Sequence, residues 1–173
     1  MNKLVFELYV FFTCFSQQVY SDFEERKNAD RLIVFSAVEK HAQNYTADKN
    51  YLVFSILGKE DNKSHLIVVE EKRFYRELYI INDTLINIEK CKPNKALKLA
   101  FNKEIYHTDI RYIDDYPENL VSSGGNPAYF CFVDKNKNSY GESITGVFGP
   151  LIDRNVHFYL LGRITRNIHK TIE

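Results

Sequence analysis

From Tyr51 onwards, short apolar runs rich in β-branched and aromatic residues alternate with polar turn residues. Runs of this kind, bounded by Gly, Pro, Asn and Asp, are typical of β-strands joined by tight connections. We expect strands at residues 51–57, 65–69, 74–81, 84–88, 96–101, 105–113, 128–133, 143–148 and 156–164. Because the connections are short, the strands are expected to form a mainly antiparallel sheet.

The segment that precedes these runs, residues 22–49, has the periodicity of a helix. Ala29, Ile33 and Ala37 recur every four residues, which places them on one helical face. Residues 31–38 also resemble a strand, because Leu-Ile-Val-Phe is a β-type run. We favour the helix, since helix-forming residues flank this run on both sides. The expected fold class is therefore α+β, with one N-terminal helix packed on a mainly antiparallel β-sheet.

Residues 1–21 have the layout of a secretory signal peptide. Lys3 supplies a positive charge, residues 8–15 form an apolar centre, and small or β-branched residues precede Asp22. The competing interpretation is a first core strand of a cytosolic domain. We favour secretion, which predicts a signal peptide at 1–21, a single globular domain at 22–173 and no membrane span after cleavage.

The number of cysteines agrees with secretion. Removal of the signal peptide takes away Cys14 and leaves Cys91 and Cys131, an even number in an oxidising compartment. We expect these two residues to form a disulfide, which would close a loop of about 40 residues and stabilise the fold by roughly 3 to 4 kcal/mol. Two buried free thiols are the alternative, and that arrangement is common in cytosolic domains.

Three Asn-x-Ser/Thr sequons follow the predicted cleavage point. They begin at Asn44, Asn62 and Asn82. In a secreted chain each sequon is a candidate site for N-linked glycosylation. The sequence therefore predicts a glycoprotein with carbohydrate at one or more of these positions.

The charge balance limits the classes of partner. The chain has 23 acidic and 23 basic residues, so its formal net charge is zero. A neutral chain exerts no global attraction on nucleic acid or on an anionic membrane, and no nucleic acid partner is expected. Binding to a polyanion would require a local basic patch. In the sequence the best candidate for such a patch is the segment 163–170, but the segment is short and we favour a solvated terminus.

One group of residues has a spacing compatible with catalysis. His41, Tyr45 and Lys49 are four residues apart, so they share one face of the expected helix. An imidazole, a phenol and an ammonium group can serve as base, proton donor and electrostatic stabiliser without a metal. No nucleophile and no orienting carboxylate accompany them in the sequence pattern. Neither a cofactor nor a metal is expected.

Two segments resemble known families. Residues 35–41 and 51–56 resemble the helix and first strand of the cystatins, which implies a helix wrapped by an antiparallel sheet and, as one possible function, inhibition of cysteine proteases. The Gln-x-Val-x-Gly loop of that family is absent here. Residues 148–159 resemble the C-terminal strand region of the poxins, which are cyclic-dinucleotide nucleases. No site residue is carried over from either family.

These observations together favour binding over catalysis. The 13 Phe and 12 Tyr residues provide apolar contact area for a core and for a partner. We expect a secreted binding protein that acts on an extracellular protein or small-molecule partner. The alternatives are a cystatin-like protease inhibitor and a metal-free nuclease or transferase-like enzyme that uses His41, Tyr45 and Lys49.

Overall fold

The computed structural model describes most of the chain after the predicted signal peptide. The described residues are 25, 28–58, 63–106, 127–146 and 153–172. The predicted signal peptide at 1–21 lies outside them. The chain divides into two compact units, residues 1–33 and residues 34–173. The prediction of one domain over residues 22–173 stays a prediction.

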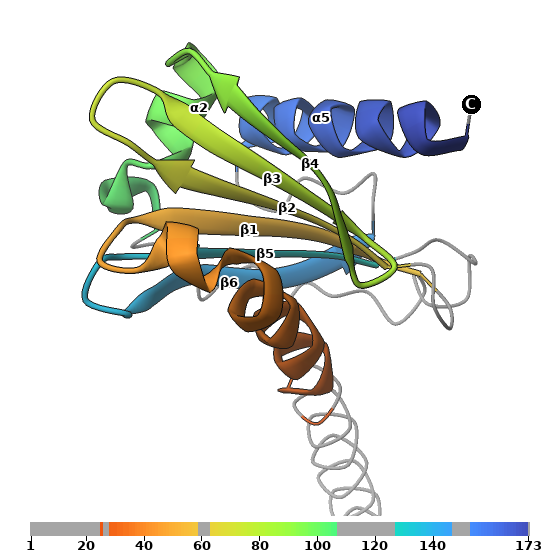
Figure 1. Cartoon of the computed structure of the whole chain (residues 1–173). Helices are drawn as coiled ribbons and strands as arrows, with labels where there is room; N and C mark the ends of the chain where they lie inside the picture. The colour runs from red at the N-terminus through yellow and green to blue at the C-terminus, as the bar shows by residue number, and fades with distance from the viewer. Residues whose placement is uncertain (1–24, 26–27, 59–62, 107–126, 147–152, 173) are drawn as a thin grey trace, which may run out of the picture. The chain divides into compact units, whose positions relative to one another are not determined.

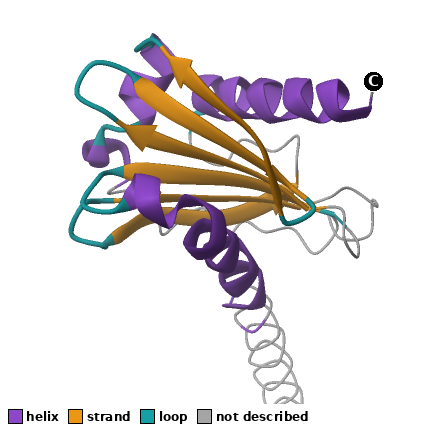
Figure 2. Cartoon of the chain, in the orientation of Figure 1, coloured by secondary structure: helices purple, strands orange, loops and turns teal. Residues whose placement is uncertain are grey.

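Six strands form one sheet in the second unit (Figures 1 and 2). Their order across the sheet is β4-β3-β2-β1-β5-β6, and neighbouring strands pair antiparallel. The strands are β1 (Tyr51–Leu57), β2 (Lys63–Glu70), β3 (Tyr75–Ile81), β4 (Thr84–Cys91), β5 (Pro127–Val133) and β6 (Ser139–Gly146). The strand β1 lies inside the sheet because β5 returns along its free side after a long connection.

Two segments that we predicted as strands are helices. Residues 96–101 belong mostly to α2 (Lys95–Ala100), and residues 156–164 lie within α5 (Arg154–Ile172). Part of a third predicted strand, 105–113, is a short 3-10 helix, η1 (Lys103–Tyr106), and its remainder lies outside the described residues.

The start of each helix explains why these strand predictions were wrong. Asn94 caps α2, because its side-chain oxygen accepts a hydrogen bond from the backbone N–H of Leu97 at 2.9 Å. Asp153 precedes α5 and accepts a hydrogen bond from the backbone N–H of Asn155 at 2.8 Å. An acceptor side chain at this position favours a helix over a strand even when the following residues are apolar.

The helix α5 covers one face of the sheet, called the α5 face below. Val156, Leu160 and Ile164 are buried at four-residue intervals and pack against apolar residues of the strands. Side chains of a strand alternate between its two faces, so only every second strand residue joins this cluster. The strand residues of the cluster are Leu52, Phe54, Leu66, Val68, Tyr75, Tyr79, Ala128, Phe130 and Phe132.

The N-terminal helix, residues 28–46, contributes its second part to the other face of the sheet, called the helix-1 face below. Val34, Val38 and Ala42 are buried. This face also buries the alternate strand residues, such as Val53, which pairs in register with Ile67 and with Cys131 on its two sides. Helical segments therefore cover both faces, and the strands of the centre are buried on each side.

The predicted fold class is confirmed. The chain is α+β, with an N-terminal helix, a six-stranded antiparallel sheet and a C-terminal helix packed on the sheet. The helix packed on the α5 face was not predicted. No helix in the described ranges is long and apolar enough to cross a membrane.

Candidate functional site

The residues proposed as a catalytic group contact different partners. The Nε2 atom of His41 lies 2.9 Å from Oδ1 of Asp83, in the turn between β3 and β4. The Nζ atom of Lys49 donates to Oε1 of Glu71 at 2.8 Å, in the turn between β2 and β3. These two turns lie at opposite ends of β3. The three residues are spaced four apart as predicted, but the side chains of His41 and Lys49 contact residues at opposite ends of β3.

Tyr45 lies between the other two and has a third partner. The guanidinium of Arg76 sits 5.4 Å from the centre of its ring, in a cation–π contact that holds the helix on β3. The structure therefore does not bring His41, Tyr45 and Lys49 together around one reacting atom. Each side chain attaches the end of the N-terminal helix to a different part of the sheet.

The predicted glycosylation positions differ in what the structure says of them. Asn44 is exposed on the N-terminal helix, and Asn82 is exposed in the turn between β3 and β4, where its φ is 47°. Asn62 lies outside the described residues. Both described positions are at the surface, as an acceptor for carbohydrate requires. Glycosylation at all three stays a prediction.

The two cysteines of the predicted disulfide lie on different strands. Cys91 ends β4 and Cys131 is in β5, with β3, β2 and β1 between them. At about 4.8 Å per strand, the backbones are about 19 Å apart, whereas the Cα atoms of a disulfide lie about 4.4 to 6.8 Å apart. Cys91 is on the α5 face, where its Sγ is 3.3 Å from the hydroxyl of Tyr159. Cys131 pairs with Val53 on the helix-1 face. The structure does not bring the two together.

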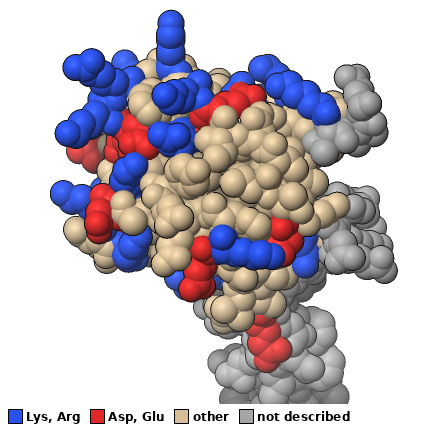
Figure 3. Space-filling view, in the orientation of Figure 1, with Lys and Arg blue, Asp and Glu red and all other residues tan. Residues whose placement is uncertain are grey.

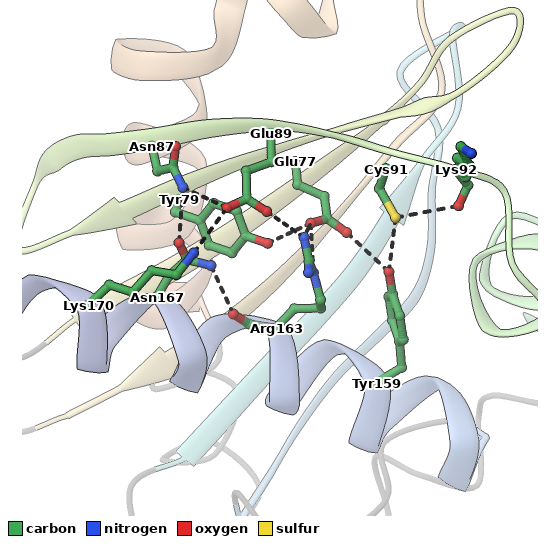
Figure 4. A network of polar contacts seen from close by, with 10 residues as sticks. All are labelled: Glu77, Tyr79, Asn87, Glu89, Cys91, Lys92, Tyr159, Arg163, Asn167 and Lys170. Carbon is green, nitrogen blue, oxygen red and sulfur yellow. Dashed lines mark hydrogen bonds and ion pairs between the residues drawn. The ribbon is translucent and has the colours of Figure 1, made fainter.

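A buried polar network joins α5 to β3 and β4, and it was not found from the sequence (Figure 4). Its centre is Glu77 of β3, whose side chain is fully buried. The Glu77 carboxylate accepts hydrogen bonds from the hydroxyls of Tyr79 at 2.5 Å and Tyr159 at 3.2 Å, and from Nε of Arg163 at 2.8 Å. A buried carboxylate with three donors and one opposite charge is well compensated.

Arg163 joins Glu77 to a second carboxylate. One of its terminal nitrogens also donates to Oε2 of Glu89 on β4, at 2.7 Å. Burial by itself would lower the pKa of Arg163, but its hydrogen bond to Glu77 and the Glu77 charge raise that pKa above its ordinary value. Burial and the hydrogen bond to Glu77 raise the pKa of Tyr79. Arg163 is therefore held as a cation and Tyr79 as a neutral donor.

Further polar side chains extend the network along α5. Asn87 of β4 donates to Glu89 at 2.9 Å and to Asn167 of α5 at 3.1 Å. Lys170, in the last turn of α5, is 3.5 Å from the same Glu89. With its central carboxylate enclosed by its own donors, this network is suited to fixing the position of α5 on the sheet. Its central carboxylate is not accessible to a substrate.

A smaller polar pair lies on the helix-1 face. The Oγ atom of Ser55 on β1 is 2.9 Å from Nδ1 of His65 on β2, and the two residues are directly opposite in the strand register. Ser55 is 0% exposed and His65 is 3% exposed. Burial, and then the nearby charge of Lys63, lower the pKa of His65 to about 4. The imidazole is therefore neutral at pH 7, and the hydroxyl is closed to a substrate.

The surface shows a different kind of cluster. Six exposed basic residues lie at one end of the sheet, and they form what we call the basic end (upper left in Figure 3). They are Lys72, Arg73, Lys90, Lys92, Lys95 and Lys98. Within the described ranges none of the six has an ion-pair partner in an acidic side chain.

Strand register assembles the basic end from separate segments. Tyr75 at the start of β3 pairs with Cys91 at the end of β4, so the turn before β3 lies beside the segment after β4. The chain then enters α2 directly, and α2 turns Leu97 inwards and carries exposed lysines. The β2–β3 turn, the end of β4 and α2 thus meet at one place.

The acidic residues nearest to this cluster are already engaged. Glu71 interacts with Lys49 and with Arg76, whose Nε atom lies 3.2 Å from it. The hydrogen bond from Lys49 lowers the pKa of Glu71, with a further contribution from Arg76. Oε2 of Glu70 accepts a hydrogen bond from Asn50 at 2.7 Å. Across residues 70–76 and 90–98 there are seven basic side chains and two acidic ones, so the region is strongly positive.

The segment that the sequence favoured as a basic patch has another role. Residues 163–170 are the last part of α5, where Arg163 binds Glu77 and Glu89, and Lys170 approaches Glu89. The charges of Arg163 and Lys170 therefore face carboxylates of the same molecule. The positive surface lies elsewhere, on segments that are separate in the sequence.

Comparison of the chain with known protein families, with curated proteins and with solved structures finds no match. The basic end and the buried networks are therefore the features from which we infer a function.

Proposed function

We propose that the protein is a secreted binding protein that contacts its partner through the basic end. The observation that supports this proposal is the clustering of six exposed cations with no acidic partner in the described part of the chain. The whole chain is neutral, so this surface is a local asymmetry of charge and not a consequence of composition. Clustered like charges repel one another, and an anionic partner relieves that repulsion.

Secretion is part of the proposal and rests on the layout of residues 1–21. The sequons at Asn44 and Asn82, which are both exposed, agree with a secreted protein. The partner is then a molecule of the extracellular space. The alternatives are less well supported. His41 and Lys49 are directed to separate carboxylates. The helix and antiparallel sheet agree with the cystatin resemblance, but the cystatin loop motif is absent from the sequence.

The test compares two variants with the same change of charge. Lys92→Gln with Lys95→Gln removes two charges from the basic end, and Lys40→Gln with Arg166→Gln removes two exposed charges elsewhere. Each full-length secreted protein is used for affinity capture from its natural fluid, and bound species are identified by mass spectrometry. We expect a species that binds wild type and the control variant but not the basic-end variant.

Two results would overturn the proposal. One is capture that the basic-end variant leaves unchanged. The other is substrate turnover by the wild-type protein that His41→Ala abolishes, which would establish the enzyme alternative instead.

A further inference from the structure

We infer that the partner of the basic end is a sulfated polysaccharide chain. This inference rests on the proposed function, because it names the chemical class that the basic end recognises. Three observations support it: the exposure of the cations, the dominance of lysine among them, and the lack, in the described residues, of features that nucleic acid or membrane recognition requires.

The exposure of the six cations favours a polymer over a small anion. All six side chains are exposed, so none is desolvated in an enclosed site. An exposed ion pair contributes little binding free energy, and a single small anion at such a surface would be bound weakly. A chain with many sulfate groups makes several of these contacts at once and gains from their number. The surface therefore fits a polyanion.

The arrangement of the lysines fits an extended chain. Lys90 and Lys92 are two residues apart at the end of β4, which places them about 7 Å apart on an extended backbone. Lys95 and Lys98 are three residues apart on α2 and share one face of that helix. Five of the six cations are lysines, which act as mobile point charges and do not require the paired oxygen geometry that arginine selects.

Nucleic acid recognition requires features that this surface does not offer in the described residues. Single strands are bound by exposed aromatic rings on which bases stack. The aromatic residue within the basic end is Phe74, which is half-buried, and its ring is already approached by Lys90 at 5.2 Å and Arg76 at 5.5 Å. The helix α2 has six residues, which is short for a helix that reads a DNA groove.

An anionic membrane is also a poorer fit. Stable attachment to a membrane combines basic residues with a second, apolar signal. The large apolar side chains exposed in the described residues are Leu32, Ile88 and Phe158, and of these Ile88 alone is on a strand that contributes to the basic end. At 38% exposure, this single side chain is a small apolar anchor.

The experiment measures binding of the full-length secreted protein to a fluorescent heparin oligosaccharide at near-physiological salt. We expect wild type to bind and the affinity to fall steeply as salt is raised. Lys92→Gln with Lys95→Gln should weaken binding at least about tenfold, since each surface cation near a polyanion strengthens binding roughly fivefold. The control, Lys40→Gln with Arg166→Gln, should bind within about twofold of wild type. All four positions are exposed, so unchanged thermal unfolding of both variants is expected and is measured alongside.

Three comparison probes identify the source of the negative charge. They are heparin from which the sulfate groups have been removed, duplex DNA of similar length, and vesicles that contain phosphatidylserine. We expect each to bind more weakly than heparin. The inference is overturned if wild type does not bind heparin, if both variants bind it equally, or if DNA or vesicles bind more tightly.

Failure of the inference and failure of the proposed function give different results. If affinity capture depends on the basic end but heparin does not bind, the basic end has another anionic partner and only the polysaccharide is excluded. If affinity capture does not depend on the basic end, the proposed function itself fails.

Discussion

The two faces of the sheet bury polar groups in different ways. On the α5 face, Glu77 is a buried carboxylate matched by Arg163 and by two tyrosine hydroxyls. On the helix-1 face, Ser55 and His65 form a buried pair that carries no charge at pH 7. One face compensates a charge, and the other avoids it. Both solutions satisfy the rule that buried polar groups find hydrogen-bond partners.

The difference determines how each face responds to change. A charged network is sensitive to the loss of one partner, because the remaining charge stays buried without compensation. A neutral imidazole is sensitive to pH, because its protonation places a new charge in the same apolar surroundings. We therefore expect mutation of a charge partner to destabilise the packing on the α5 face most, and a fall in pH to destabilise the packing on the helix-1 face most.

The largest effect is expected for Arg163→Leu. This change leaves the fully buried Glu77 without its counter-charge, and breaking a buried pair in this way destabilises a fold by about 3 to 5 kcal/mol. Urea denaturation of the full chain at pH 7 measures the difference. The control is Arg166→Leu on the same helix, where the side chain is exposed and an effect within about 0.5 kcal/mol is expected.

A second variant keeps this prediction informative if Arg163→Leu fails to fold. Arg163→Leu combined with Glu77→Gln removes both charges, so it should be more stable than Arg163→Leu alone. A stability for Arg163→Leu within about 1 kcal/mol of wild type would show that the network does not bury an ion pair of the kind described.

The second effect is a loss of stability on acidification, and His65 is its source. The folded pKa of about 4 lies below the ordinary value of 6.5, so the unfolded state binds the proton more tightly. The stability that this difference provides is fully present above pH 7, decreases as the pH falls through 6.5, and is lost near pH 4. Between pH 7.5 and 5 we expect a decrease of about 2 kcal/mol from this group.

Unfolding measured at pH 7.5 and pH 5 tests this for wild type and for His65→Asn. The variant lacks the imidazole, so its stability should change less over the same interval. Glu71 and Asp83 have lowered pKa values, and their contributions are lost only at lower pH, as the carboxylates themselves become protonated. Equal pH dependence in the two proteins would contradict the assignment to His65.

The strands of the sheet were largely predicted from the sequence, whereas the C-terminal helix was not. The runs that became β1 and β5 are continuously apolar and bounded by turn residues, so their length and composition identify them. Residues 156–164 also contain β-branched and aromatic residues, which led us to predict a strand. The correct signal was present: Val156, Leu160 and Ile164 recur at four-residue intervals after the capping residue Asp153.

The buried network and the full extent of the basic end were not predictable, because strand register creates them. The four lysines at 90–98 are visible as a local cluster in the sequence. Glu77 and Arg163 are separated by 86 residues, and neither has a neighbour in the sequence that points to the other. In the same way, the turn that carries Arg73 lies beside the segment that carries Lys92 only because β3 and β4 pair with Tyr75 opposite Cys91. A sequence shows local charge, but it does not show which turns a sheet brings side by side.

Removing one hydroxyl on each face is expected to have smaller effects than breaking the buried ion pair. Tyr79→Phe takes one donor from a charged carboxylate, and a hydrogen bond to a charged group contributes about 1.5 to 3 kcal/mol. Ser55→Ala takes the partner of a neutral imidazole, where a contribution of about 1 kcal/mol is expected. Both side chains are buried and each change removes a single oxygen, so the difference between the two losses of stability isolates the effect of charge on the hydrogen-bond partner.

Urea denaturation at pH 7 should rank Tyr79→Phe as the more destabilising change. The reverse order would mean that the hydrogen bonds from Arg163 and Tyr159 are sufficient for the Glu77 carboxylate. It would also mean that the hydrogen bond between Ser55 and His65 contributes more to stability than the one from Tyr79.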